Sequence, residues 1–103
     1  PTPWPCFVIA VREEVLEKNP DLISKILSII NQTTEEFKDI PSIDKTLALK
    51  FHQKIEDVQE WLSLTEWSQK SPSAEMLNKV QNQLFQLKII DKKGTFENIV
   101  KTV

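Results

Sequence analysis

Few side chains in this sequence could do acid–base or metal chemistry. His52 is the only histidine, and Glu56 follows it at a spacing of one helical turn. The two groups could both bind a metal ion, but a structural zinc site needs about four ligands and a catalytic one about three. We therefore interpret them as a surface histidine near a glutamate, and we predict no metal site.

Nucleophilic catalysis would need a thiol beside a base, and Cys6 with His52 is the only such combination in the chain. A small thiol in an apolar run is more often a packed side chain than a nucleophile. The single glycine excludes a glycine-rich phosphate loop. The sequence thus predicts no catalytic residue, no enzyme activity and no cofactor.

The charged residues are typical of a solvated surface. Glu13–Glu14 and Glu35–Glu36 are adjacent pairs whose side chains point to different parts of a helix surface, so they do not share a proton. The net charge is −2, and the lysines at 88, 92 and 93 lack interleaved aromatic residues. This balance indicates no nucleic-acid partner and no attraction to an anionic membrane.

The three tryptophans have different expected roles. Trp61 and Trp67 lie in or next to helical stripes and are expected to pack in or beside the core. Trp4 stands in the proline-rich start of the chain, beside Pro5 and Cys6. A rigid backbone there could present the indole to a cleft, which is the alternative to simple packing.

These candidates are positioned by a predicted strand over residues 5–11. Phe7–Val11 is β-branched and aromatic, is bounded by prolines and by Arg12, and does not alternate with polar residues. A strand that is apolar on both faces belongs inside a covered sheet. No second strand is predicted, so either another chain or an upstream part of a longer protein must pair with this one.

About five helices are expected after the strand. Residues 12–18 suit one or two turns, and Asn19 with Pro20 marks the start of a long amphipathic helix that ends before Pro41. Two later helices are predicted from Ile43 to about Gln53, with Ser42 as the N-cap, and over residues 55–62. Two more are predicted after the start signal Ser71–Pro72, with an apolar stripe from Met76 to Leu87, and from the cap Thr95 to the end. Residues 63–73 are a predicted loop with Trp67 as an anchor, and Gly94 is predicted to be left-handed in a turn.

Two segments resemble a known family. FVIAVREEVLEKNPDLISKIL (residues 7–27) and LNKVQNQLFQLKIIDKKGTFENIV (residues 77–100) are similar to the C-terminal part of periplasmic solute-binding proteins of ABC importers. The most similar group handles sulfonates, nitrate, and thiamine or its pyrimidine precursor. Lys88 stands where the family usually has a glycine, and this departure affects the expected helix end.

The resemblance implies that residues 1–103 are a mostly α piece with one β-strand, the C-terminal segment of an α/β two-lobed fold. It further implies capture of a small solute for an ABC permease, closure of the lobes by hinge motion, and a periplasmic or lipid-anchored location. Most solute contacts would lie upstream, and Trp4, Pro5 and Cys6 would be the ligand-binding residues here.

The alternative is a stand-alone helical interaction module. In this hypothesis the Phe7–Val11 strand adds to a partner's sheet or exchanges between two copies of the chain. It predicts self-association of the isolated chain through this strand.

Overall fold

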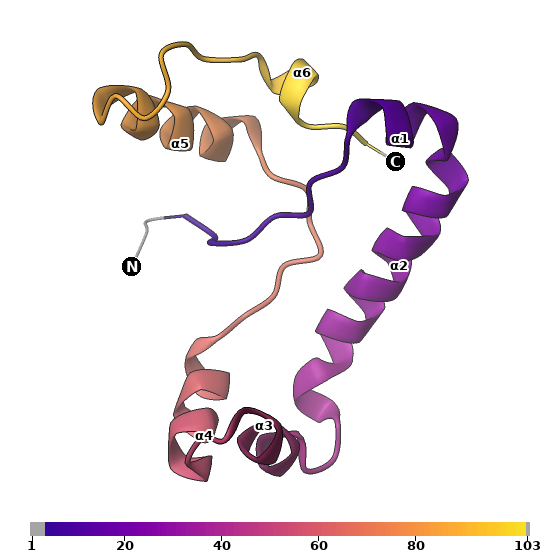
Figure 1. Ribbon diagram of the computed structural model, residues 1–103, viewed down its shortest axis with the longest axis vertical. Helices are drawn as coiled ribbons and strands as arrows, with labels where there is room; N and C mark the ends of the chain where they lie inside the picture. The colour runs from indigo at the N-terminus through magenta and orange to yellow at the C-terminus, as the bar shows by residue number, and fades with distance from the viewer. Residues whose placement is uncertain (1–3, 103) are drawn as a thin grey trace. The chain divides into compact units, whose positions relative to one another are not determined.

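The computed structural model describes residues 4–102, and all regular secondary structure in this part of the chain is helical. Helices account for 63% of the described residues and β-strands for none of them. In chain order the elements are α1 (Glu13–Lys18), α2 (Pro20–Glu36), the 3₁₀ turn η1 (Phe37–Asp39), α3 (Ile43–Phe51), α4 (Ile55–Leu64), α5 (Ala74–Gln86) and α6 (Phe96–Ile99) (Figure 1). They form two compact units. The central unit is residues 24–69, and the terminal unit is the chain up to residue 23 and from residue 70 onward.

The predicted strand over residues 5–11 is wrong. These residues have no regular secondary structure, and Phe7, Val8 and Ile9 are exposed by 93%, 69% and 54%. β-Branched residues favour a strand only where a neighbouring strand pairs with the backbone and a packed surface covers the side chains. No described residue supplies that neighbour. The chain is therefore not a strand-containing piece of an α/β two-lobed fold.

The central unit is built around α3 and α4, which pack against each other. Val58 of α4 is its buried apolar side chain, at 7% exposure. Gln59 of α4 donates a hydrogen bond from Nε2 to Asp44 Oδ2 of α3 at 2.9 Å. The helix predictions for this region are confirmed to within two residues. Ser42 precedes α3 as predicted, but it has φ of 57° and its side chain makes no capping bond.

The terminal unit contains α1, α5 and α6. α1 follows Arg12, and Glu13 Oε1 lies 3.9 Å from Lys101 Nζ near the other end of the chain. α5 starts two residues later than the predicted Ser71–Pro72 signal, because the Ser73 hydroxyl accepts the hydrogen bond from the Met76 N–H at 3.1 Å. A serine at this position satisfies a backbone donor that the first turn of a helix would otherwise leave without a partner.

Gln81 holds the loop after α5 against the helix. Its Nε2 donates to the Gly94 carbonyl at 3.1 Å, and the Gly94 N–H donates to its Oε1 at 2.7 Å. Gln81 is buried, at 7% exposure. The prediction that Gly94 is left-handed is wrong, because its φ is not positive. A Cβ at Gly94 would lie 2.7 Å from Ile99 Cδ1, so the glycine permits close approach of α6.

The left-handed residue at the end of α5 is Lys88, with φ of 58°. The Lys88 N–H donates to the Phe85 carbonyl at 3.0 Å, and the Ile89 N–H donates to the Leu84 carbonyl at 2.9 Å. These two bonds are the Schellman pattern that usually places glycine at the left-handed position. The chain therefore stops α5 with a lysine in a conformation that costs an L-residue about 1–2 kcal/mol.

Candidate functional site

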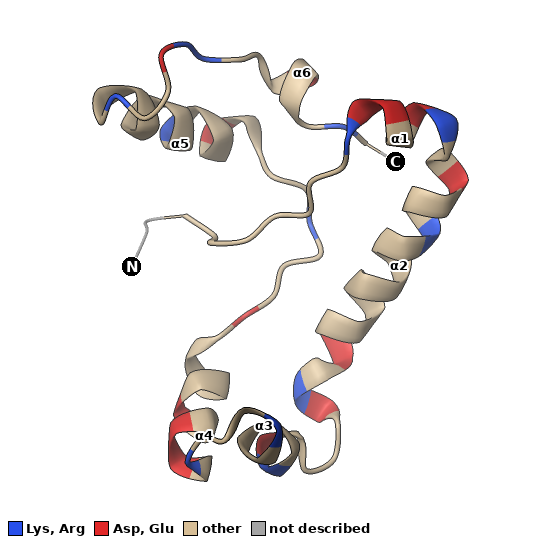
Figure 2. Cartoon of the chain, in the orientation of Figure 1, with Lys and Arg blue, Asp and Glu red and all other residues tan. Residues whose placement is uncertain are grey.

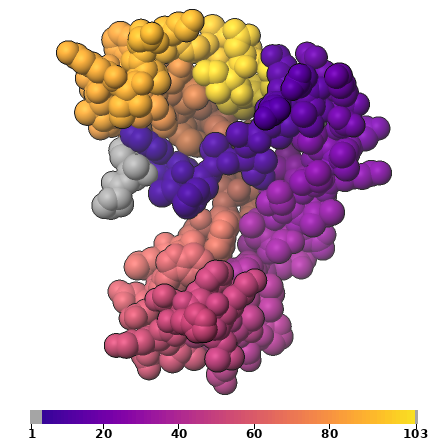
Figure 3. Space-filling model, viewed as in Figure 1, coloured from indigo at the N-terminus to yellow at the C-terminus, as the bar shows by residue number. Residues whose placement is uncertain are grey.

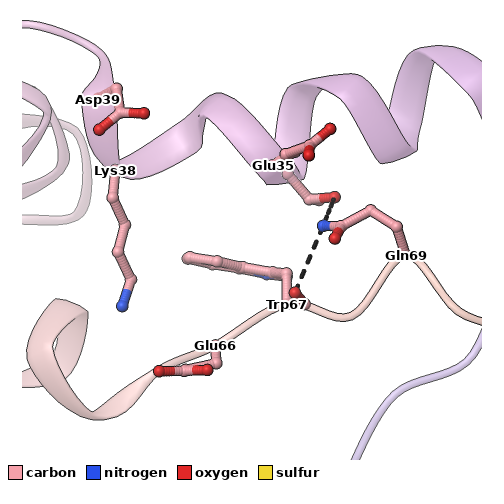
Figure 4. A pocket seen from close by; sticks show the side chains of 7 residues that line it. Glu35, Lys38, Asp39, Glu66, Trp67 and Gln69 are labelled. Atoms are coloured by element: carbon pink, nitrogen blue, oxygen red, sulfur yellow. Dashed lines mark hydrogen bonds between the residues drawn. The ribbon is translucent and has the colours of Figure 1, made fainter.

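An open cavity of about 310 Å³ lies within the central unit. The end of α2, η1 and the segment after α4 form its walls (Figure 4). The lining residues are Thr34, Glu35, Lys38, Asp39, Glu66, Trp67 and Gln69. Apart from Trp67 they are all polar or charged, so the cavity has a polar lining with one large apolar surface, the Trp67 indole.

Trp67 is held in place by other aromatic rings. Its ring centroid lies 5.0 Å from that of Phe37 with an interplanar angle of 60°, and 5.9 Å from that of Trp61 at 76°. Both are edge-to-face arrangements, which aromatic quadrupoles favour. The prediction that Trp67 anchors the loop is confirmed. Trp61 takes part in this cluster although it remains 49% exposed.

Gln69 is fixed at the rim of the cavity by its side-chain amide. Nε2 donates to Thr34 Oγ1 at 3.2 Å and to the Trp67 carbonyl at 3.3 Å. The first bond connects the segment after α4 to α2, within the central unit, and the second lies within that segment. They leave the Gln69 Oε1 atom as a hydrogen-bond acceptor at the rim.

The charged groups of the cavity do not converge. In Figure 4 the Asp39 carboxylate lies on the opposite side of the helical ribbon from the Trp67 indole, whereas Lys38 and Glu66 lie on the indole's side. Among the described residues, Lys38 makes no ion pair within 4.0 Å. None of the lining residues is a Ser, Cys or Lys nucleophile hydrogen-bonded to a base, and the cavity offers carboxylates, one ammonium group and the Trp67 indole as contact groups.

The residues that the resemblance implied for ligand binding lie elsewhere. Trp4 is half-buried, while Pro5 and Cys6 are exposed, all three in the irregular segment ahead of α1. This segment belongs to the terminal unit, and none of the three residues lines the cavity. Their proposed contact with a solute stays a prediction.

The candidate metal and nucleophile residues lie on different elements of the chain. His52 ends α3 with φ of 53° and is exposed, and Glu56 is exposed in the first turn of α4. Within residues 4–102 no group of three His, Cys, Asp or Glu side chains is close enough to hold a metal ion. Cys6 belongs to the terminal unit and His52 to the central unit.

Sequence reasoning found only Trp67 among the residues of the cavity. Thr34, Lys38 and Gln69 look like ordinary surface residues in the sequence, because their roles depend on contacts across 30 or more residues, such as the Gln69–Thr34 bond. An aromatic residue in an otherwise polar loop was the only local signal.

Comparison of the chain with protein-family models, with characterised proteins and with solved structures found no match. The resemblance to solute-binding proteins thus rests on the two quoted segments. None of the helices in the described part is both long enough and apolar enough to cross a membrane.

Proposed function

We propose that this chain is a helical protein-binding module that contacts another polypeptide through residues Phe7–Val11. The main support is the exposure of this apolar run, which reaches 93% at Phe7 and is still 39% at Val11. Atoms of this segment are visible on the face shown in Figure 3. Contiguous exposed apolar side chains are characteristic of interaction sites.

The backbone of this segment adds to the argument. Among the described residues, no backbone N–H or C=O of Phe7–Val11 has a backbone hydrogen-bond partner. An irregular segment with available donors and acceptors can pair with the edge of a partner's sheet, while alternate side chains enter pockets. In this proposal the pairing forms with the partner and not within the chain. The segment carries no charge, so its desolvation costs little.

Photo-crosslinking tests this proposal in the cells that make the protein. A photoreactive phenylalanine analogue would replace Phe7, and the matched control would carry it at Glu17, an exposed position of α1. We expect a discrete adduct with another protein from position 7, absent from position 17 and lost when Val8→Asp is added. No adduct at position 7, or the same adducts at both positions, would overturn the proposal.

Solute capture for an ABC importer is the second proposal. It is supported by the resemblance and by the cavity beside Trp67, whose volume lies at the low end of the roughly 300–1,000 Å³ typical of ligand sites. It is the weaker one, because the fold that the resemblance implied is wrong. Calorimetric titration with a sulfonate, nitrate and thiamine tests it. Saturable heat that Trp67→Ala abolishes would support it, and no heat with any of the three would overturn it.

A further inference from the structure

The charge of this chain is unevenly distributed along the sequence. The overall charge of −2 gives no expectation of attraction to an anionic membrane, but residues 70–103 contain six lysines and only three carboxylates. The first 69 residues contain seven basic and twelve acidic residues. Such a difference between two parts of a chain is typical of proteins that have a basic surface for an anionic partner.

Three of these lysines lie at the end of α5 and in the loop that follows it. They are Lys88, Lys92 and Lys93, and all three are exposed. Figure 2 shows basic positions in blue in this part of the chain, interrupted by one acidic position, which is Asp91. Among the described residues, none of the three lysines makes an ion pair within 4.0 Å. Residues 87–94 therefore have a surplus of two positive charges.

Large apolar side chains are exposed at the same place. Phe85, Leu87 and Ile89 are exposed by 45%, 61% and 66%. Lys88 stands between Leu87 and Ile89 in the sequence, and Lys93 Nζ lies 5.0 Å from the centre of the Phe85 ring. The basic and apolar side chains thus form one mixed patch. We call this patch the α5 tip, and it consists of Phe85, Leu87, Lys88, Ile89, Lys92 and Lys93.

The loop is fixed on α5, so the α5 tip is preformed. Lys93 Nζ donates to Asn82 Oδ1 at 2.7 Å, and Gln81 exchanges two hydrogen bonds with the backbone of Gly94. The Schellman hydrogen bonds described above fix the helix end itself. A patch that is held in this way loses little conformational freedom when it binds.

The arrangement suits a lipid surface better than a folded protein. The α5 tip lies where the helix ends and the chain reverses direction (Figure 1), and its apolar side chains are interspersed with lysines instead of forming a stripe. At an anionic bilayer, apolar side chains enter the boundary between headgroups and acyl chains, while lysines keep their ammonium groups near the phosphates. Fluid headgroups adapt to such a mixed patch, whereas a folded partner needs complementary pockets and carboxylates at fixed positions.

We propose that the α5 tip docks this chain peripherally on an anionic lipid surface. Each lysine near such a surface strengthens binding about fivefold, so a surplus of two positive charges gives a preference of about 25-fold over a neutral surface. The patch is distinct from Phe7–Val11 and leaves that segment available to another polypeptide. The inference goes beyond the proposed function and does not depend on it.

Co-sedimentation of the full chain with lipid vesicles tests the proposal. One set of vesicles contains phosphatidylcholine and phosphatidylglycerol at two to one, and the other contains phosphatidylcholine alone. We expect binding to the mixed vesicles to be about 25-fold tighter than to the neutral ones. Most of this difference should disappear in about 1 M salt, where charges are screened within about 3 Å.

Three substitutions locate the contact. Lys92→Glu changes the charge of the α5 tip by two and should weaken binding to the mixed vesicles about 25-fold. Lys79→Glu is the matched control, because this exposed residue of α5 lies roughly 13 Å along the helix from Lys88, beyond the screening length of about 8 Å at physiological salt. The control should change binding less than about twofold, which is the effect expected outside that length. Leu87→Ser should weaken binding about tenfold, because the leucine no longer leaves water. All three residues are exposed, and circular dichroism checks that the helices are intact.

Three results would overturn the proposal. The first is equal binding, or none, to the two kinds of vesicles. The second is an equal loss of binding for Lys92→Glu and Lys79→Glu, which would mean that no particular patch makes the contact. The third is binding to soluble polyglutamate as tight as to the mixed vesicles, which would assign the α5 tip to an acidic protein and not to lipid.

Discussion

Replacing Gln81 with alanine should destabilise the terminal unit by about 2–3 kcal/mol. The substitution removes both hydrogen bonds to Gly94, at 2.7 and 3.1 Å, from a side chain that is 7% exposed. Each bond contributes about 0.5–1.5 kcal/mol net, and a buried donor or acceptor left without a partner costs about 1–3 kcal/mol. The hydrogen bonds to the Gly94 N–H and carbonyl are part-buried and not fully enclosed, so the total loss of stability should stay near about 2–3 kcal/mol and not reach the sum of the largest values.

Urea unfolding and hydrogen exchange measure this effect. The unfolding equilibrium constant should rise about 30- to 150-fold, and exchange of the Gly94 amide should accelerate. Gln83→Ala is the matched control, because Gln83 lies on the same helix and is exposed. Both variants share the gain in helix propensity from alanine, so their difference isolates the bonds to Gly94.

The reasoning fails if Gln81→Ala and Gln83→Ala have free energies of unfolding within about 0.5 kcal/mol of each other, the usual effect of a surface substitution. It also fails if Gly94 exchanges at the same rate in both. Either result would mean that the loop after α5 is held by contacts other than this side chain.

Three further predictions concern the end of α5, the aromatic cluster and α3. Lys88→Gly should raise the free energy of unfolding by about 0.5–1 kcal/mol in urea unfolding. The cost of holding a lysine in the left-handed conformation is larger than the cost of the extra backbone entropy that glycine gives the unfolded chain, and a loss of stability would contradict this. Trp67→Ala should cost about 2–3 kcal/mol and Trp67→Phe clearly less, by the same assay; equal losses would show that ring contacts do not matter. The pKa of Asp44 is lowered by the hydrogen bond from Gln59 and then by that from the Lys45 N–H. The resulting stabilisation is present above the ordinary pKa and is lost as pH falls through the lowered value, so Asp44→Asn should flatten the acid limb of a plot of urea midpoint against pH; an unchanged limb would contradict this.

The sequence alone was sufficient for the long helices. The Asn19–Pro20 start and the apolar spacing after Leu22 predicted α2, and the stripe from Met76 predicted α5. These signals are local, because helix hydrogen bonds join residues four apart and the caps lie within one turn. The cap of α5 was predicted at Ser71, and the structure places it at Ser73, whose hydroxyl accepts the Met76 N–H.

The tertiary structure decided everything that depends on distant partners. Phe7–Val11 has the composition of a strand, but a strand needs a neighbour and none of the described residues provides one. Gln81 looks like a solvated helix residue in the sequence. It is buried because its side-chain amide is hydrogen-bonded to the backbone of Gly94, 13 residues later. The cavity beside Trp67 likewise exists because Gln69 meets Thr34 across 35 residues. Local periodicity carries information about the helices themselves, whereas such pairings depend on how the chain folds back, which no local pattern contains.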